Sequence, residues 1–221
     1  MAERPRYIAV EGPPGVGKTS LARILADRFG MRLILERAED NPFLREFCKD
    51  PKRYAFQMHL FMLVARYQQQ DALNQEDLFQ RAGVATDFSF FKDRILATVN
   101  LSPAELALHE KIHAILCPRL PKPDLVVYLQ ARTDVLMARL RKKFHQAEED
   151  GEEAYMPPTS YVEEVARAYR YFFFHYNESP LLVVNTSEID FVGSQTDQDE
   201  LLAVIRRTKA GTHHYLPLGS H

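Results

Sequence analysis

The stretch "VEGPPGVGKTSLARIL", residues 10–25, contains a glycine-rich sequence of the form G-x-x-x-x-G-K-[ST], in which the fixed positions are Gly12, Gly17, Lys18 and Thr19. A short β-branched and aliphatic run, "YIAV" (7–10), precedes it, and a segment with helical spacing follows it. A strand before the loop and a helix after it are the context in which this motif binds phosphate. The sequence therefore predicts a phosphate-binding loop near its beginning.

Each fixed position of the loop has a chemical purpose. Glycines let backbone N–H groups point inward at phosphate oxygens, and the N-terminus of the following helix adds positive potential. Lys18 is expected to reach the outer phosphates of ATP, and Thr19 is a candidate Mg²⁺ ligand. The predicted ATP-binding set is Gly12, Gly15, Val16, Gly17, Lys18, Thr19 and Ser20. Phosphate loops also occur in switches and motors, so the activity depends on the rest of the chain.

The rest of the chain alternates between short apolar runs and longer helical patterns. Five runs read as strands: 7–10, 33–35, 83–86, 124–129 and 181–185. Segments with helical spacing include 18–29, 54–73, 103–116, 134–144 and 161–177. This alternation favours a parallel sheet with helices on both faces. We expect an α/β fold of the P-loop NTPase type, a three-layer sandwich around a five-stranded parallel sheet.

Length and charge limit the possible partners. At 221 residues and 46% hydrophobic content, the chain is long enough for one sizeable domain and too short for two ordinary ones. The 28 Lys and Arg nearly balance the 30 Asp and Glu, and no long run of one sign occurs. This composition does not indicate a nucleic acid or an anionic membrane as partner, and favours a small molecule.

The two cysteines, Cys48 and Cys117, have no short metal-type spacing. We interpret them as reduced thiols of a cytosolic protein and expect both to be core residues. The N-terminus has no apolar stretch long enough for a signal peptide, and no later run approaches membrane-spanning length. These observations predict a cytoplasmic protein.

Two polar segments are expected to be mobile. Residues 145–160, "HQAEEDGEEAYMPPTS", follow the basic run "RLRKK" and contain one glycine and two prolines. They read as a loop between helices, and 139–160 is the candidate lid. The tail carries the adjacent His213 and His214 without a further ligand nearby, which favours a mobile polar tail over a metal site.

Beyond the loop, the chain resembles the deoxynucleoside kinase family, in particular its bacterial deoxyadenosine/deoxyguanosine kinase branch. The resemblance lies in "EGPPGVGKTSLA" (11–22), "EDNPFLREF" (39–47), "DPKRYAFQMHLFMLVARY" (50–67), "FFKDRILATVNLSPAELALHEKI" (90–112), "PDLVVYLQA" (123–131), "YVEEVARAYRYFFFHY" (161–176) and "SPLLVVNTSEIDFV" (179–192). It implies a five-stranded parallel sheet, an arginine-rich lid, a homodimer, and ATP-dependent phosphorylation of a nucleoside 5′-hydroxyl.

The resemblance assigns two charged residues to the acceptor. Glu36 follows the second predicted strand, where the family has the carboxylate that accepts the proton of the attacking hydroxyl. Positioning of the nucleophile matters more in phosphoryl transfer than a strong base does. Arg66 matches a family arginine near the substrate and needs a partner if it is buried. The alternatives are a solvated strand-end charge for Glu36 and a surface salt bridge for Arg66.

Two acceptor positions depart from the family pattern. His59 replaces a glutamine whose amide reads the base edge, and an imidazole cannot make the same bidentate contact. His59 is equally compatible with a histidine satisfied within the core. Cys48 stands where the family often has a tyrosine that binds the sugar 3′-hydroxyl, and a thiol is a much weaker hydrogen-bonding group.

Departures also occur around the transferred phosphate. After the third strand the family usually has an acid followed by Arg-Ser, whereas this chain has "ATDFSFF". Asp87 keeps the acid and is a candidate ligand of Mg²⁺ through water, or else a solvated strand-end charge. The lid keeps Arg139 and Arg141 but has Lys143 and His145 near further family arginines. A lysine lacks the planar fork with which arginine clamps phosphate, and the basic run is also compatible with a solvated helix face.

Three functions follow from these observations. The first is a deoxynucleoside kinase with an altered acceptor preference or a low rate, in which Arg139 and Arg141 stabilise the migrating phosphoryl group. The second is a catalytically impaired nucleotide-binding protein that acts on a protein partner. The third is a nucleoside monophosphate kinase, whose acceptor phosphate the basic residues 139–143 would bind.

Overall fold

The computed structural model describes residues 7–76, 83–151 and 154–217, which form two compact units. The described part of the first unit comprises residues 7–34, 83–87, 123–151 and 154–217. The second comprises residues 35–76 and 88–122. The chain therefore leaves the first unit twice and returns to it twice, and each unit is described below by itself.

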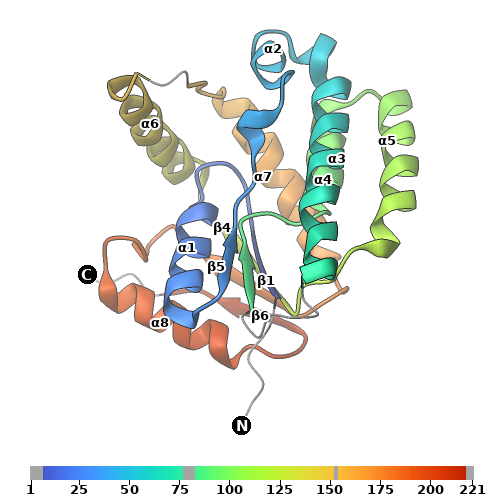
Figure 1. Ribbon diagram of the computed structural model, residues 1–221. Coiled ribbons are helices and arrows are strands. Elements are labelled where there is room, and N and C mark those ends of the chain that lie inside the picture. Colours follow the sequence, from blue (N-terminus) through green and yellow to red (C-terminus); the bar gives the residue numbers. More distant parts are fainter. Residues whose placement is uncertain (1–6, 77–82, 152–153, 218–221) are drawn as a thin grey trace. The chain divides into compact units, whose positions relative to one another are not determined.

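The first unit is built on a six-stranded parallel sheet (Figure 1). Its strands are β1 (Tyr7–Glu11), β2 (Arg32–Ile34), β3 (Val84–Thr86), β4 (Leu125–Gln130), β5 (Leu181–Asn185) and β6 (Thr212–Tyr215). Their order is β2-β3-β1-β4-β5-β6, so β1 lies in the interior between β3 and β4. Ala9 marks this register, because it pairs with Thr86 on one side and Val126 on the other. All five residues of β1 are buried, as expected for a strand covered on both faces.

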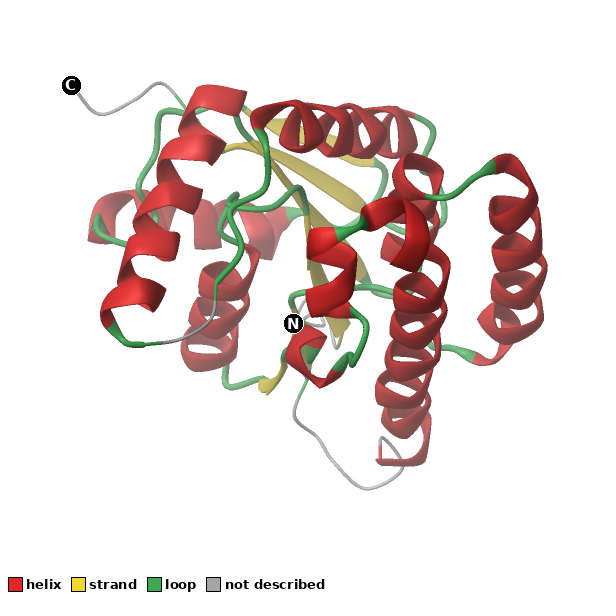
Figure 2. Ribbon diagram, turned by 90° about the horizontal axis from the view of Figure 1, so that it is seen from above, coloured by secondary structure: helices red, strands yellow, loops and turns green. Residues whose placement is uncertain are grey.

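The described part of the first unit contains four helices: α1 (Lys18–Phe29), α6 (Thr133–Glu149), α7 (Thr159–Phe174) and α8 (Gln195–Arg207). Helices α1 and α8 lie on one face of the sheet, joined by the ion pair of Arg28 with Asp199 at 2.5 Å, and α7 lies on the other (Figures 1 and 2). On the α7 face, Tyr128 of β4 stacks on Phe173 with ring centroids 4.3 Å apart. The predicted α/β sandwich is confirmed.

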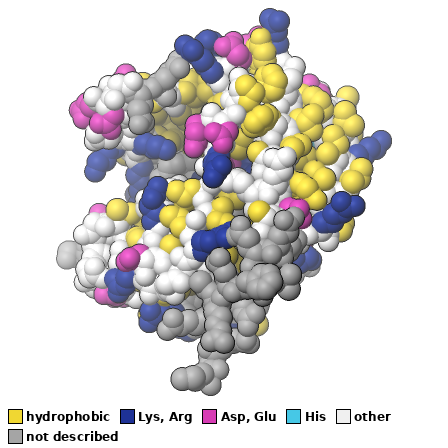
Figure 3. Space-filling model, in the orientation of Figure 1, with side chains coloured by type: hydrophobic (Ala, Val, Ile, Leu, Met, Phe, Trp, Pro, Cys, Tyr) yellow, Lys and Arg dark blue, Asp and Glu magenta, His cyan; other side chains and the backbone are white. Residues whose placement is uncertain are grey.

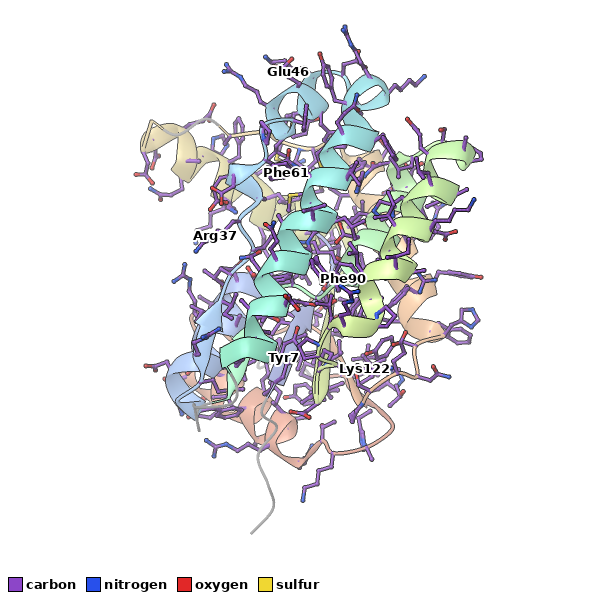
Figure 4. All side chains as sticks on the ribbon, turned by 45° about the vertical axis from the view of Figure 1, so that its right-hand side comes forward. Tyr7, Arg37, Glu46, Phe61, Phe90 and Lys122 are labelled. Carbon is purple, nitrogen blue, oxygen red and sulfur yellow. The ribbon has the colours of Figure 1, made fainter. Side chains whose placement is uncertain are left out.

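The second unit is helical. Its elements are a 3₁₀ turn (Ala38–Asp40), α2 (Leu44–Lys49), α3 (Pro51–Glu76), α4 (Lys92–Asn100), α5 (Pro103–Leu116) and a 3₁₀ turn (Cys117–Arg119). Helices α3 and α5 lie side by side in both ribbon views. Phe90, just before α4, lies beside them and stacks on His113 of α5 at 4.3 Å (Figure 4). A capping box formed by Ser102 and Glu105 begins α5, which explains why this helix starts where the sequence predicts.

The sixth strand corrects two expectations, the five-stranded sheet and the mobile polar tail. Residues Thr212–Tyr215, which include His213 and His214, form β6 and pair with β5 in parallel register. Three of these four residues are exposed, so this edge strand is held by its backbone ladder and carries no apolar pattern that a sequence could reveal.

Two further expectations were wrong. Helix α6 continues to Glu149, five residues past the predicted end at 144, so residues 145–149 are helical and not a loop. Glutamine, alanine and glutamate favour helices, and the chain turns only at Gly151, whose φ is 73°. Cys117 is exposed and not a core residue, because it lies in the 3₁₀ turn after α5, and Cys48 is only partly buried.

Side chains of both charge signs, Lys and Arg as well as Asp and Glu, occur on the face shown in Figure 3. None of the helices in the described part of the chain is long and apolar enough to cross a membrane.

Candidate active site

The phosphate loop is a tight backbone turn between β1 and α1. Gly12 has φ of 150°, and a Cβ there would lie 2.4 Å from the carbonyl oxygen of Leu129, so only glycine fits. A Cβ at Gly15 would lie 2.8 Å from the carbonyl oxygen of Leu136 and from Leu140 of α6. The loop is therefore packed directly against β4 and α6, which fixes its curvature.

The positive groups of the loop converge on its interior. Lys18 is the first residue of α1, and its Nζ donates to the carbonyl oxygens of Gly12 at 2.8 Å and Pro13 at 3.1 Å. Gly17 is the N-cap of α1 and has no side chain to cap the helix, so the first N–H groups of α1 can serve an anion. The ammonium group of Lys18 and the N-terminus of α1 together make this turn suited to binding an anion.

Thr19 and Asp87 meet beside this loop. The Thr19 hydroxyl donates to Oδ2 of Asp87 at 2.5 Å, where β3 ends and α1 begins. A hydroxyl and a carboxylate are the hard oxygen donors that Mg²⁺ takes in a nucleotide site, with waters and phosphates completing its shell. This pair fits that ion, although no group of three or more His, Cys, Asp or Glu suited to a metal occurs among the described residues.

Helix α6 brings one of the two predicted lid arginines to the loop. The Arg139 guanidinium donates to the carbonyl oxygen of Val16 at 3.4 Å and that of Thr186 at 2.8 Å. Burial lowers the pKa of Arg139, and the negative charge of Asp190 opposes this shift. Arg141 is exposed and has no ion pair or hydrogen bond within the described ranges. The structure thus fixes Arg139 beside the loop and leaves Arg141 in solvent.

Glu36 lies in the second unit, in an ion-pair cluster with Arg66 of α3 and with Lys92 and Asp93 of α4. Arg66 Nε donates to Oε1 of Glu36 at 2.6 Å, and Nη2 of Arg66 contacts the same oxygen. Lys92 Nζ pairs with Oε2 of Glu36, and Arg66 Nη1 pairs with Asp93. The Glu36 side chain is 14% exposed and that of Arg66 only 3%. Glu36 is therefore not a solvated charge at a strand end, and Arg66 does not form a surface salt bridge.

Local structure holds Glu36 at this place. Gln69 of α3 donates its side-chain N–H to the carbonyl oxygen of Leu35 at 3.0 Å, which ties the segment after β2 to α3. The next residue, Arg37, is exposed (Figure 4). Glu36 is therefore held within the cluster at a point where its neighbour reaches solvent.

The cluster keeps Glu36 ionised. Burial raises the pKa of Glu36, but the charges of Arg66 and Lys92 outweigh burial and bring the pKa down to about 2. Asp93 is fully buried, and its Oδ2 has no hydrogen-bond partner among the described residues. Burial raises the pKa of Asp93 to about 6 against the opposing charge of Arg66. Arg66 is thus shared between two carboxylates.

His59 lies on α3 in the same unit and is 1% exposed. Its Nε2 is 2.9 Å from the amide nitrogen of Asn100, and its ring meets that of His109 edge-on with centroids 6.2 Å apart. Burial, followed by the charges of Arg66 and His109, lowers the pKa of His59 to about 3, so the imidazole is neutral. Neutral Nε2 accepts the Asn100 N–H, which leaves Nδ1 as the donor.

The remaining predicted residues are less constrained. Cys48 on α2 is half-buried, burial raises the pKa of its thiol, and it makes no hydrogen bond to the described residues. Val16 is fully buried, and Ser20 is half-buried within α1. The structure therefore gathers the predicted residues into two sets: the phosphate loop with Asp87 and Arg139, and Glu36 with Arg66 and His59.

Lys92 and Asp93 are the cluster members that the sequence analysis missed. They follow Glu36 by 56 and 57 positions, and an ion pair between residues so far apart leaves no periodic pattern in the sequence. The available signal was the "KD" pair beginning a helix directly after the aromatic run "FSFF". Charges next to so apolar a segment are buried only when they are paired.

Comparison with known proteins extends over most of the chain. The family model described as deoxynucleoside kinase matches residues 8–209. A deoxyguanosine kinase of Bacillus subtilis (strain 168) is 33% identical over 204 residues, which cover 90% of this chain and 96% of that protein. A deoxyadenosine kinase of Lactobacillus acidophilus is 28% identical and covers 90% and 94% respectively.

Solved structures show the same fold. The deoxyadenosine kinase of M. mycoides, solved with the products dCMP and dCDP, superposes with a TM-score of 0.73 at 23% identity, covering 90% of this chain and 97% of that one. The same enzyme with bound dATP also gives a TM-score of 0.73.

Proposed function

Because this chain belongs to the deoxynucleoside kinase family, we propose that it transfers the γ-phosphoryl group of ATP to the 5′-hydroxyl of a deoxynucleoside. The observation that carries this proposal is the ionised Glu36, held at both carboxylate oxygens by Arg66 and Lys92. Switches, motors and kinases all have a phosphate loop, so the loop alone does not identify a kinase. A carboxylate held in a fixed position can in addition bind and orient an acceptor hydroxyl.

The first unit would bind the donor. Backbone N–H groups of the loop and of the N-terminus of α1 would donate hydrogen bonds to the phosphates, and Lys18 would reach their outer oxygens. Thr19 and Asp87 would hold Mg²⁺, which when bound neutralises charge on the phosphates. Arg139, fixed on the loop, would place positive charge beside the transferred group, and Arg141 would join it from solvent.

The second unit would bind the acceptor, with Glu36 as the group that touches the 5′-hydroxyl. A carboxylate with a pKa near 2 is a weak base, so it cannot carry a proton early in the reaction. It can accept a hydrogen bond from the 5′-hydroxyl, and this bond directs a lone pair of the hydroxyl oxygen at the phosphorus. In a loose phosphoryl-transfer transition state, this orientation is the larger contribution. In this arrangement Arg66 holds Glu36 in place and lies near the substrate.

A purine deoxynucleoside is the first acceptor to test. The relatives named above are a deoxyguanosine kinase and a deoxyadenosine kinase, and both match this chain over nine tenths of its length. His59 and Cys48 would lie at the base and the sugar, where each offers fewer hydrogen bonds than the family's usual residue. Selectivity among bases is therefore expected to differ from that of the relatives.

The remaining features of the proposal concern assembly and place. Residues 1–221 would act as a single P-loop kinase domain, with 139–160 as its lid-like segment, since neither compact unit is a continuous piece of chain. Apolar side chains exposed on α5, Leu108 and Ile115, support a homodimer. The low cysteine content of the chain, which has Cys48 and Cys117 alone, supports a cytoplasmic location. Sedimentation at two protein concentrations tests the dimer.

The test of the activity is ADP release from ATP and Mg²⁺ with each deoxynucleoside and each deoxynucleoside monophosphate, with the Lys18→Ala protein as the blank. We expect stimulation by a purine deoxynucleoside. Stimulation by monophosphates alone would make the protein a nucleoside monophosphate kinase. ATP binding without stimulation by any acceptor would leave the catalytically impaired nucleotide-binding protein as the better function.

A further inference from the structure

Lys92 is a buried lysine with one clear partner. It is 8% exposed, begins α4, and pairs its Nζ with Oε2 of Glu36. Lysine is almost never buried unless it is paired, because removing an ammonium group from water is costly. Its position is also unfavourable for the helix, since a cation at the first residue opposes the macrodipole. Helix stability alone therefore does not account for Lys92.

The charges of the cluster balance only when Lys92 is counted. Glu36 and Asp93 supply two negative charges, and Arg66 binds both of them. Without Lys92 the buried group would carry a net negative charge, with one guanidinium divided between two carboxylates. Lys92 supplies the second positive charge and takes the oxygen of Glu36 that Arg66 does not hold.

Both oxygens of Glu36 are fixed from different helices as a result. Arg66 of α3 takes Oε1 and Lys92 of α4 takes Oε2, so rotation of the carboxylate would break one pair or the other. Phe88, where the family pattern has an arginine, is fully buried and carries no charge. Lys92, four residues later, is therefore the cation that the segment after β3 contributes to Glu36.

We propose that Lys92 is a positioning residue for phosphoryl transfer, which keeps Glu36 ionised and aimed at the acceptor 5′-hydroxyl. This inference rests on the proposed kinase activity. Lys92 acts through Glu36, so its loss should change the pH at which the enzyme works as well as its rate.

The charged groups that face Glu36 fix the direction of that change. Arg66 on α3 and Lys92 on α4 pair with Glu36, and Asp93 on α4 pairs with Arg66 beside it. Burial raises the pKa of Glu36, Arg66 and Lys92 lower it, and the negative charge of Asp93 acts against ionisation nearby. Removing Lys92 therefore raises the pKa of Glu36. If ionised Glu36 is required, activity should then be lost at a higher pH as the solution is acidified.

The experiment is a profile of kcat against pH, with ATP and the best acceptor, for wild type, Lys92→Met, Lys92→Arg and Lys52→Met. Lys52 is an exposed lysine of α3 and is the matched control. For Lys92→Met we expect kcat at neutral pH to fall about tenfold or more and the acid limb to move up by roughly one pH unit or more. The KM for ATP should change less than twofold, because the phosphate loop is untouched. Lys92→Arg should recover most of the rate, and Lys52→Met should match wild type.

A second measurement keeps the inference testable if Lys92→Met folds poorly. The double variant Glu36→Gln/Lys92→Met removes both charges, so urea unfolding should show it to be more stable than Lys92→Met alone. Lys92→Met with wild-type kcat and an unmoved acid limb would overturn the inference, and so would equal stability of the single and double variants. A wild-type protein that is inactive on every acceptor would instead overturn the proposed kinase activity, and with it the role of Lys92 in catalysis.

Discussion

The phosphate loop and the Glu36 cluster carry the two halves of the proposed reaction, and they are built in different ways. The loop uses backbone groups within eight consecutive residues, and Gly12 and Gly15 are required because β4 and α6 leave no room for a Cβ at these positions. The cluster uses side chains from the segment after β2, from α3 and from α4, held by opposite charges in a buried place. Local backbone geometry specifies the first, and long-range electrostatics specifies the second.

This difference predicts how each region fails. A loop that binds through backbone N–H groups should lose function without losing the fold when one side chain is removed. A cluster of four buried charges should lose stability first, because deleting one partner leaves an unpaired charge behind. Substitutions in the two regions should therefore separate activity from stability.

The largest effect is expected for Lys18→Ala in the loop. Removing the ammonium group that reaches the outer phosphates should lower kcat by about three orders of magnitude. Thermal unfolding should change far less than kcat, because Lys18 is half-buried and its partners at Gly12 and Pro13 are neutral backbone carbonyl oxygens, so its removal leaves no buried charge unpaired. ADP release and a melting curve measure the two properties. A variant that loses both together would show that the loop is not the independent region described above.

Next in size is the effect of Arg66→Met on stability. The substitution keeps an unbranched apolar stem but leaves Glu36 and Asp93 without their shared guanidinium. We expect the free energy of unfolding to fall by about 3–5 kcal/mol, measured in urea at pH 7.5. Arg53→Met is the matched control, because Arg53 is an exposed arginine of the same helix. Equal losses in the two variants would mean that the buried ion pairs contribute nothing specific.

Glu36→Gln also tests the contrast between the loop and the cluster, because it changes the cluster residue that is proposed to contact the acceptor. The amide keeps the shape of the carboxylate but cannot accept two cations. We expect kcat to fall about a hundredfold with little change in ATP affinity, as measured by ADP release and by equilibrium binding of ATP. An equal loss of ATP affinity would assign Glu36 a structural role and separate it from the acceptor.

The same contrast explains which parts of the fold were predictable. Helix α1 and helix α5 have the predicted ends, because a glycine N-cap and a capping box mark them in the sequence. Strand β6 was missed because its exposed residues, including His213 and His214, pair through the backbone alone. Helix α6 was predicted too short because its last turns are polar, and a polar run resembles a loop when no apolar stripe continues through it.

In the candidate site, groups of residues that are neighbours in the sequence were predicted together, and groups that are far apart in the sequence were not. The loop residues lie together in the motif and the fold keeps them together. The need for a partner of Arg66 was foreseen, but its partners Glu36 and Asp93 lie 30 and 27 residues away, where only the fold brings them into contact. Lys92 was missed for the same reason. The roles of all these residues in the reaction remain predictions that the variants above test.

The smallest predicted effect concerns His59, the buried neutral histidine next to the cluster. Its pKa is lowered to about 3 by burial and by the charges of Arg66 and His109. In the unfolded chain it titrates near 6.5, so below that pH the unfolded state binds the extra proton and the folded state does not. The stability due to neutral His59 is therefore complete above about pH 6.5 and declines as the pH falls toward 3.

Between pH 7.5 and pH 5 the free energy of unfolding of wild type should fall because of His59, and that of His59→Gln should not. We expect the fall to be smaller for His59→Gln by roughly 2 kcal/mol. Glutamine can still accept the Asn100 N–H, so the comparison at pH 7.5 reports packing and the difference at pH 5 reports titration. His214→Gln, at an exposed position of β6, should keep the wild-type pH dependence. If His59→Gln also kept it, the pKa of His59 would not be lowered by folding, and the imidazole would be protonated at pH 5 in the folded protein as it is in the unfolded chain.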